Sequence, residues 1–214
     1  MKLFLASYRF GADSSSLTKL IPPPASVGVI ANAADAWPPA ARKWAVQSEI
    51  RSLSQLGYRA TEIDLRLFER AEPGARATRL AEALMSHDLL WVRGGNTFVL
   101  RSQLARSGAD TEIRRAVIDG NLAYGGYSAG ACIASPALDG LELCDDVDEV
   151  AMVGDGKLMW DGLGLVPFRI VPHFRSPGHE NPERIEQLAA RYAQEDVPFR
   201  ALSDDDAIVV DGHW

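Results

Sequence analysis

An alternation of short apolar runs with helical patterns, continuing through residues 1–135, restricts the fold of this chain more than any other feature. The predicted strands are residues 2–7, 26–31, 60–65, 88–93 and 121–127. The predicted helices are residues 40–56, 75–86, 97–106 and 111–119. Because neighbouring parallel strands are usually joined through a helix, this order predicts a largely parallel sheet covered on both faces. We therefore expect a three-layer α/β/α fold in a single domain that spans residues 1–214.

The last third of the chain is less regular. Residues 159–171 are typical of a connecting hairpin or strand, residues 181–195 of a helix, and residues 200–203 and 207–210 of two final strands. The apolar positions of residues 40–56, Trp44 among them, fit a helix only loosely, whereas Met85 is expected on the inner face of the helix at residues 75–86. Residues 11–16 are expected to form a polar loop.

The segment Gly126-Tyr-Ser-Ala-Gly130 closes the fifth predicted strand and fits the G-x-S-x-G pattern of a nucleophile elbow. Glycines around such a serine allow strand and helix to approach closely and let the hydroxyl stand clear. A following helix would add free N–H groups beside a developing oxyanion. The alternative is a glycine-rich turn that carries an incidental serine.

A serine hydroxyl needs a base to remove its proton and an acid to orient that base. His173 is the candidate base because it follows a β-branched run and a proline at the end of a predicted strand. We interpret His87 and His179 as surface residues, and His213 stands next to the C-terminus. Asp204, directly after an apolar strand, is the candidate acid.

Four blocks together resemble the dipeptidase E and cyanophycinase family of serine peptidases. They are residues 94–98 (GGNTF), 126–131 (GYSAGA), 172–174 (PHF) and 202–208 (LSDDDAI). The resemblance implies a fold similar to class I glutamine amidotransferases, with serine in place of their cysteine. It also implies a serine peptidase that hydrolyses short peptides through an acyl-enzyme, acting as a dipeptidase with some preference for N-terminal aspartate.

The resemblance carries roles to individual residues. Ser128 would be the nucleophile, His173 the general base and acid, and Asp204 the orienting acid, with Asp205 as the alternative. The backbone N–H groups of Gly95 and Ala129 would form the oxyanion hole. The residues expected to contact the substrate are Asn96, Thr97, Tyr127, Asp146 and Arg175.

Substrate choice depends on two further segments. Relatives that cleave after an N-terminal aspartate resemble one another in an arginine before the helix that follows the histidine block, and Asn181 stands at that position here. Arg175 or Arg184 could replace that arginine, since a guanidinium binds a carboxylate through two hydrogen bonds. The acidic residues at 145–149 are either a solvated loop or the site that binds the substrate's amine.

Composition excludes several classes of function. The net charge of −7 and the absence of a basic run disfavour nucleic-acid binding. The two cysteines and the His/Asp/Glu spacing imply no metal and no cofactor. No segment has the length of a membrane span or a signal peptide, so a cytoplasmic location is expected, with a homodimer as an open alternative for assembly.

Two other functions remain open at this point. One is a non-catalytic small-molecule-binding module that keeps the same fold. The other is an ordinary α/β-hydrolase esterase, whose chain order of serine, acid and histidine would be met by Ser128, Asp204 and His213.

Overall fold

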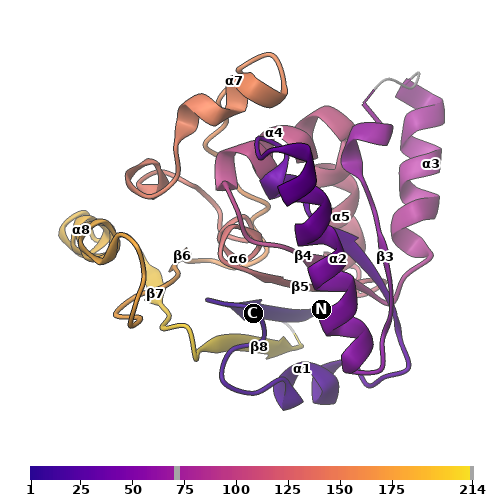
Figure 1. Ribbon diagram of the computed structural model, residues 1–214, viewed down its shortest axis with the longest axis horizontal. Coiled ribbons are helices and arrows are strands. Elements are labelled where there is room, and N and C mark those ends of the chain that lie inside the picture. The colour runs from indigo at the N-terminus through magenta and orange to yellow at the C-terminus, as the bar shows by residue number, and fades with distance from the viewer. Residues whose placement is uncertain (70–72, 213–214) are drawn as a thin grey trace.

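A six-stranded sheet forms the centre of the computed structural model, which describes residues 1–69 and 73–212 (Figure 1). The strands follow the order β3-β2-β4-β5-β1-β8. Their bounds are β1 Lys2–Ala6, β2 Ser26–Ile30, β3 Arg59–Glu62, β4 Leu89–Val92, β5 Ala123–Tyr127 and β8 Ala207–Asp211. The first five are parallel, and β8 pairs with β1 in the antiparallel direction. The predicted, largely parallel sheet is therefore confirmed.

Helices cover both faces of this sheet. The α-helices are α1 Ser15–Leu20, α2 Pro39–Gln55, α3 Pro73–Met85, α4 Thr97–Ser107, α5 Ala109–Ile118, α6 Ala129–Cys132, α7 Val150–Val153 and α8 Pro182–Gln194. Short 3₁₀ turns occur at η1 Asn32–Ala34, η2 Leu65–Leu67, η3 Leu141–Leu143 and η4 Val147–Glu149.

Alternate residues of each strand enter two separate hydrophobic clusters. In β1, Phe4 and Ala6 pack with α1 and α2, whereas Leu3 and Leu5 pack with α3, α4 and α5 on the other face. This period of two is what a strand buried on both faces must show. The α/β/α layering is thus confirmed at the level of the packed side chains.

A second, two-stranded parallel sheet pairs β6 (Arg169–Val171) with β7 (Phe199–Ala201), and α8 connects them (Figure 1). The pairing continues past the strands, because Leu202 N–H donates to Val171 O at 2.9 Å and Phe174 N–H donates to Leu202 O at 2.8 Å. Residues that follow β6 and β7 therefore lie side by side. Of the range predicted as hairpin or strand, only Arg169–Val171 is a strand, with an isolated bridge between Ala137 and Asp161.

Two local predictions are wrong. Met85 is exposed, although it was expected on an inner face, and Trp44, one of the loosely fitting apolar positions of α2, is 61% exposed. In α2 the buried stripe includes Arg42, which pairs with Asp35 and Glu62, and Glu49, which accepts from Tyr127 OH. The expected loop at residues 11–16 instead contains the start of α1, which buries Leu17.

None of the helices that the structure describes has the length and apolar character that a bilayer crossing would require.

Candidate active site

Ser128 lies in the sharp turn between β5 and α6 and has backbone angles of φ 51° and ψ −118°. A positive φ is costly for a residue with a Cβ, so the surrounding structure must hold this turn in place. A Cβ on Gly130 would lie 2.0 Å from Val92 O, and one on Gly126 would lie 2.7 Å from Gly130 O. Both glycines of the G-x-S-x-G pattern are thus required by close approach of β4, β5 and α6. The helix that follows comprises the four residues Ala129–Cys132.

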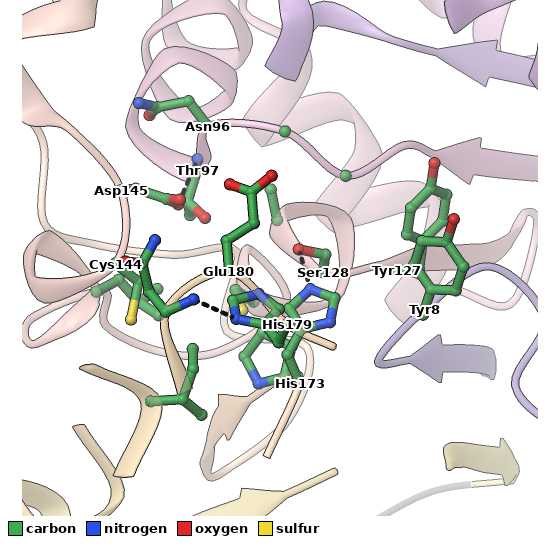
Figure 2. A pocket seen from close by; sticks show the side chains of 18 of the residues that line it. Tyr8, Asn96, Thr97, Tyr127, Ser128, Cys144, Asp145, His173, His179 and Glu180 are labelled. Atoms are coloured by element: carbon green, nitrogen blue, oxygen red, sulfur yellow. Dashed lines mark hydrogen bonds between the residues drawn. The ribbon is translucent and has the colours of Figure 1, made fainter. Parts of the chain in front are cut away.

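Three side chains from distant segments form a hydrogen-bonded chain. His173 Nε2 lies 3.1 Å from Ser128 Oγ, as Figure 2 shows, and His173 Nδ1 lies 2.6 Å from Asp204 Oδ1. A carboxylate only accepts, so Nδ1 carries the proton and Nε2 is left to accept from the serine hydroxyl. This arrangement can transfer a proton from Ser128 to His173. His173 follows β6 and has a φ of 59°, which turns its ring toward the elbow.

The structure separates the two candidate acids. Asp204 contacts His173, whereas Asp205 is exposed and its backbone oxygen accepts a hydrogen bond from Ala12 N–H at 3.0 Å. The esterase alternative required His213, which lies outside the described residues.

Two buried serines hold the histidine and aspartate segments together, and sequence reasoning missed both. Ser7, at the end of β1, accepts from His173 N–H at 2.6 Å and donates to Asp204 Oδ1 at 3.0 Å. Ser176 accepts from Asp204 N–H at 2.9 Å and donates its own N–H to His173 O at 3.2 Å. These bonds fix the relative positions of His173 and Asp204.

The loop after β4 lies directly against the elbow. A Cβ on Gly94 would lie 2.9 Å from Ser128 Cβ, and one on Gly95 would lie 2.6 Å from Ala33 O. Gly95 also has a φ of +148°, which side chains rarely adopt. The loop can approach Ser128 at position 94 and Ala33 at position 95 only with glycine at each. Ala129 directly follows Ser128, and Gly95 lines the same cavity as the nucleophile.

These segments surround a cavity of about 770 Å³ whose lining includes Ser128, His173 and Asp204. Asn96, Thr97, Tyr127 and Asp146 line it, as expected, but Arg175 does not. The Arg175 side chain is 73% exposed and pairs with Glu186 at 3.2 Å.

The hydrogen bonds of Asn96, Thr97 and Tyr127 are directed into the protein. Asn96 Oδ1 accepts from the N–H groups of Phe98 and Val99, and its Nδ2 donates to Asp146 O and Glu149 Oε2. Thr97 N–H donates to Asp145 Oδ2 at 2.8 Å. Tyr127 OH donates to Glu49 Oε1 at 2.7 Å, and burial raises the pKa of this phenol well above its ordinary value. These residues therefore shape the cavity walls.

His179, which we expected on the surface, stacks on His173 with ring centroids 4.7 Å apart. Its Nδ1 accepts from Asn181 N–H at 3.2 Å, so the proton is on Nε2. Burial and the neighbouring His173 lower the pKa of His179, which keeps the ring neutral near pH 7. The stacked neutral ring restricts the orientation of His173.

One wall of the cavity is acidic. The wall is lined by Asp145, Asp146, Glu149 and Glu180. For the three of these that belong to residues 145–149, this favours a place in the substrate site over a solvated loop. Asp148 does not line the cavity. Burial and the nearby Glu149 raise the pKa of Asp145. Burial and Asp145 raise the pKa of the adjacent Cys144 to about 12, so this residue remains a thiol. In the view of Figure 2, Asp145 and Glu180 lie on the opposite side of Ser128 from Tyr8 and Tyr127.

No group of three or more His, Cys, Asp or Glu side chains is arranged to hold a metal ion within residues 1–69 and 73–212.

Comparison with known proteins points to a peptidase family. Residues 34–214 match the sequence profile of peptidase family S51. An uncharacterized peptidase of Pasteurella multocida (strain Pm70) is 29% identical over 168 residues, which cover 78% of this chain and 74% of the relative. Peptidase E of Streptomyces coelicolor is 35% identical over 145 residues, which cover 66% of this chain and 54% of the relative.

A third relative, the probable alpha-aspartyl dipeptidase of Drosophila melanogaster, is 31% identical over 135 residues, or 61% of this chain and 53% of the relative. The alignments thus reach only about half the length of the peptidase E and alpha-aspartyl dipeptidase relatives. The crystal structure of a proposed peptidase E from Listeria monocytogenes EGD-e superimposes with a TM-score of 0.76 at 26% identity, covering 98% of this chain and 93% of that one.

Proposed function

Because the chain belongs to peptidase family S51, we propose that it is a serine dipeptidase whose catalytic triad is Ser128, His173 and Asp204. The observation that carries the proposal is the hydrogen-bonded chain from Ser128 Oγ through His173 to Asp204, at 3.1 and 2.6 Å. Ser128 also has a positive φ and lines a cavity that is large enough for a short peptide. Serine-type hydrolysis of peptides follows from the family, and the residue roles are our proposal.

In the first half of the reaction, Ser128 Oγ attacks the scissile carbonyl carbon while its proton passes to His173 Nε2. Asp204 stabilises the imidazolium through the Nδ1–H bond. The N–H groups of Gly95 and Ala129 would donate to the oxyanion, since Ala129 directly follows Ser128 and Gly95 lines the same cavity. Collapse of the tetrahedral intermediate breaks the C–N bond, and the leaving amine takes the proton from His173 Nε2.

In the second half, a water molecule loses a proton to His173 Nε2 as its oxygen adds to the acyl-enzyme carbonyl. When this intermediate collapses, Ser128 Oγ leaves and recovers the proton from the histidine. The products are a free carboxylic acid and the original enzyme.

The acidic wall supports specificity for a free N-terminus. A protonated amine beside Asp146, Glu149 and Glu180 would gain charge-assisted hydrogen bonds, which an acetylated amine could not make. Two relatives are named peptidase E and probable alpha-aspartyl dipeptidase, which supports some preference for N-terminal aspartate. Since Asn181 stands where an arginine is expected, we propose a mixed preference in which Asp-X dipeptides are not the exclusive substrates.

The test is hydrolysis of Asp-Leu, Ala-Leu and N-acetyl-Asp-Leu by the wild type and by variants. Ser128→Ala and His173→Ala should each reduce kcat by about a thousandfold or more while the fold is kept. Acetylation should reduce kcat/KM tenfold or more, as expected for a contact worth about 1.5–3 kcal/mol. Activity of Ser128→Ala within tenfold of the wild type would refute the proposed nucleophile, and equal rates for free and acetylated substrate would remove the acidic wall from the site.

A further inference from the structure

The cavity wall on the Tyr8 and Tyr127 side carries two arginines, Arg9 and Arg93. Arg9 follows β1 and has a positive φ of 47°. Its Nε donates to Tyr8 OH at 3.3 Å, and its Cζ lies 5.6 Å from the centroid of the Tyr8 ring. Arg93 directly follows β4, and its Cζ lies 4.8 Å from the centroid of the Trp37 ring. Stacking on aromatic rings holds both guanidinium groups at the edge of the cavity.

Among the residues that the structure describes, the buried carboxylate of Glu49 offsets part of this positive charge. Its oxygens already accept from Trp91 Nε1 at 3.0 Å and from Tyr127 OH at 2.7 Å. Arg93 Nε lies 3.5 Å from Glu49 Oε1 and has no hydrogen-bond partner among the described residues, whereas Arg93 Nη1 donates to Gly94 O at 2.6 Å.

Arg9 forms no ion pair with any of the described residues. Besides the bond to Tyr8 OH, its Nη1 donates to Ser52 Oγ at 3.4 Å. The wall therefore holds two guanidinium groups against the one carboxylate of Glu49.

The cavity is thus polarised across the nucleophile. Asp145 and Glu180 lie on one side of Ser128 and Tyr8 and Tyr127 on the other (Figure 2). A dipeptide at neutral pH has the same polarity, with an ammonium at one end and a carboxylate at the other. Its extended backbone spans about 7 Å, and the scissile carbonyl lies between the two charged ends.

We propose that Arg9 and Arg93 form a subsite for the C-terminal carboxylate of the dipeptide substrate, an inference that rests on the proposed dipeptidase function. If the acidic wall takes the amine, the scissile carbonyl reaches Ser128 with the leaving residue directed at the arginines. A guanidinium group matches a carboxylate through two parallel hydrogen bonds, and both arginines line the cavity.

The main alternative is that the arginines bind the side chain of an N-terminal aspartate. That carboxylate belongs to the same residue as the amine, so it would lie on the acidic side of Ser128. The layout of charges therefore favours the C-terminal carboxylate. The subsite then selects for length, because a longer peptide or an amide places a neutral group beside the two guanidinium groups.

Calorimetric binding in a Ser128→Ala background tests this subsite without turnover. The ligands are Asp-Leu, Asp-leucinamide and Ala-Leu, and the added variants are Arg9→Gln and Arg93→Gln. Arg51→Gln is the matched control, because Arg51 is exposed on α2 outside the cavity lining. The amide should bind at least tenfold more weakly than Asp-Leu, and each cavity variant should weaken Asp-Leu at least threefold while changing the amide less than twofold.

Several outcomes would overturn the subsite. These are an amide penalty below threefold, equal weakening of both ligands by Arg9→Gln and Arg93→Gln, or no binding of either ligand. If Arg9→Gln and Arg93→Gln instead bind Asp-Leu and Ala-Leu with equal affinity, while Asp-leucinamide still binds more weakly than Asp-Leu, the arginines contact the aspartate side chain. Arg9→Gln decides the matter if Arg93→Gln fails to fold. Hydrolysis by the wild type is measured separately from binding. If the protein hydrolyses no dipeptide but still binds Asp-Leu more tightly than Asp-leucinamide, the proposed function is refuted and the carboxylate subsite is retained.

Discussion

The side chain of Ser7 offers a direct test of how the site is held together. Its hydroxyl is fully buried, accepts from His173 N–H at 2.6 Å and donates to Asp204 Oδ1 at 3.0 Å. Ser7→Ala removes both bonds and leaves the His173 N–H without a partner. The chain also supplies a matched control in Ser135, which is equally buried and whose Oγ has no hydrogen-bond partner among the described residues.

The expected cost follows from the two lost bonds. A hydrogen bond to a charged group contributes about 1.5–3 kcal/mol, and a buried donor left unpaired costs about 1–3 kcal/mol. Because the two effects share one site they do not add fully, and we expect Ser7→Ala to lower the free energy of unfolding by about 2–4 kcal/mol. Even the lower figure corresponds to a fall in Tm of about 4–8 °C for a chain of this size. Ser135→Ala removes a buried hydroxyl that has no hydrogen-bond partner among the described residues, so it should not lower the free energy of unfolding.

Urea unfolding followed by circular dichroism gives the free energies, and dipeptide hydrolysis gives the catalytic effect. We expect kcat of Ser7→Ala to fall at least tenfold with KM changed less than threefold, because His173 and Asp204 lose their alignment while the substrate pocket is kept. Ser7→Thr, which retains the hydroxyl, should recover part of kcat if the added methyl group fits. Equal unfolding free energies and equal kcat values for Ser7→Ala and Ser135→Ala would refute the positioning role of Ser7.

Two further predictions concern acidic residues. Burial and the nearby Glu149 raise the folded-state pKa of Asp145 above its ordinary value of 3.8. The ionised carboxylate therefore destabilises the fold at neutral pH, and this penalty disappears as the pH falls toward 3.8. Asp145→Asn, which keeps an acceptor for Thr97 N–H, should therefore have a higher Tm than the wild type at pH 7 and lose that advantage near pH 4; a constant or reversed difference contradicts this. Asp204→Asn should lower kcat about a thousandfold or more by holding His173 in the wrong tautomer, whereas Asp205→Asn should stay within threefold, and the opposite order would identify Asp205 as the acid.

The sheet and the elbow were predictable because their signals are local. Apolar runs that alternate with helices, and the glycines of the G-x-S-x-G pattern, depend on neighbouring residues and on close backbone approach. His173 and Asp204 were candidates because each follows a predicted strand, and the family resemblance supported the same order of serine, histidine and acid. The pairing of β6 with β7 explains why these two residues lie together.

Residues whose partners are distant in the sequence could not be predicted. Ser7 contacts residues 166 and 197 positions away, and no pattern around residue 7 marks it. Glu49 lies on the buried side of α2 because Trp91 and Tyr127 donate hydrogen bonds to it. A charged residue at a buried position breaks the helical spacing of apolar residues in this segment. His179 looked like a loop residue, since its stacking on His173 depends on how the chain turns before α8.

Labelling with a fluorophosphonate, followed by peptide mass mapping, tests the central claim most directly, because such reagents phosphonylate serines that a neighbouring base has activated. The account predicts one adduct, on Ser128, with Ser135 unmodified. It also predicts that the rate of adduct formation falls at least a hundredfold in His173→Ala. An adduct on a different residue, or an unmodified Ser128 in protein that hydrolyses dipeptides, would contradict the assignment of Ser128 and His173 as nucleophile and base.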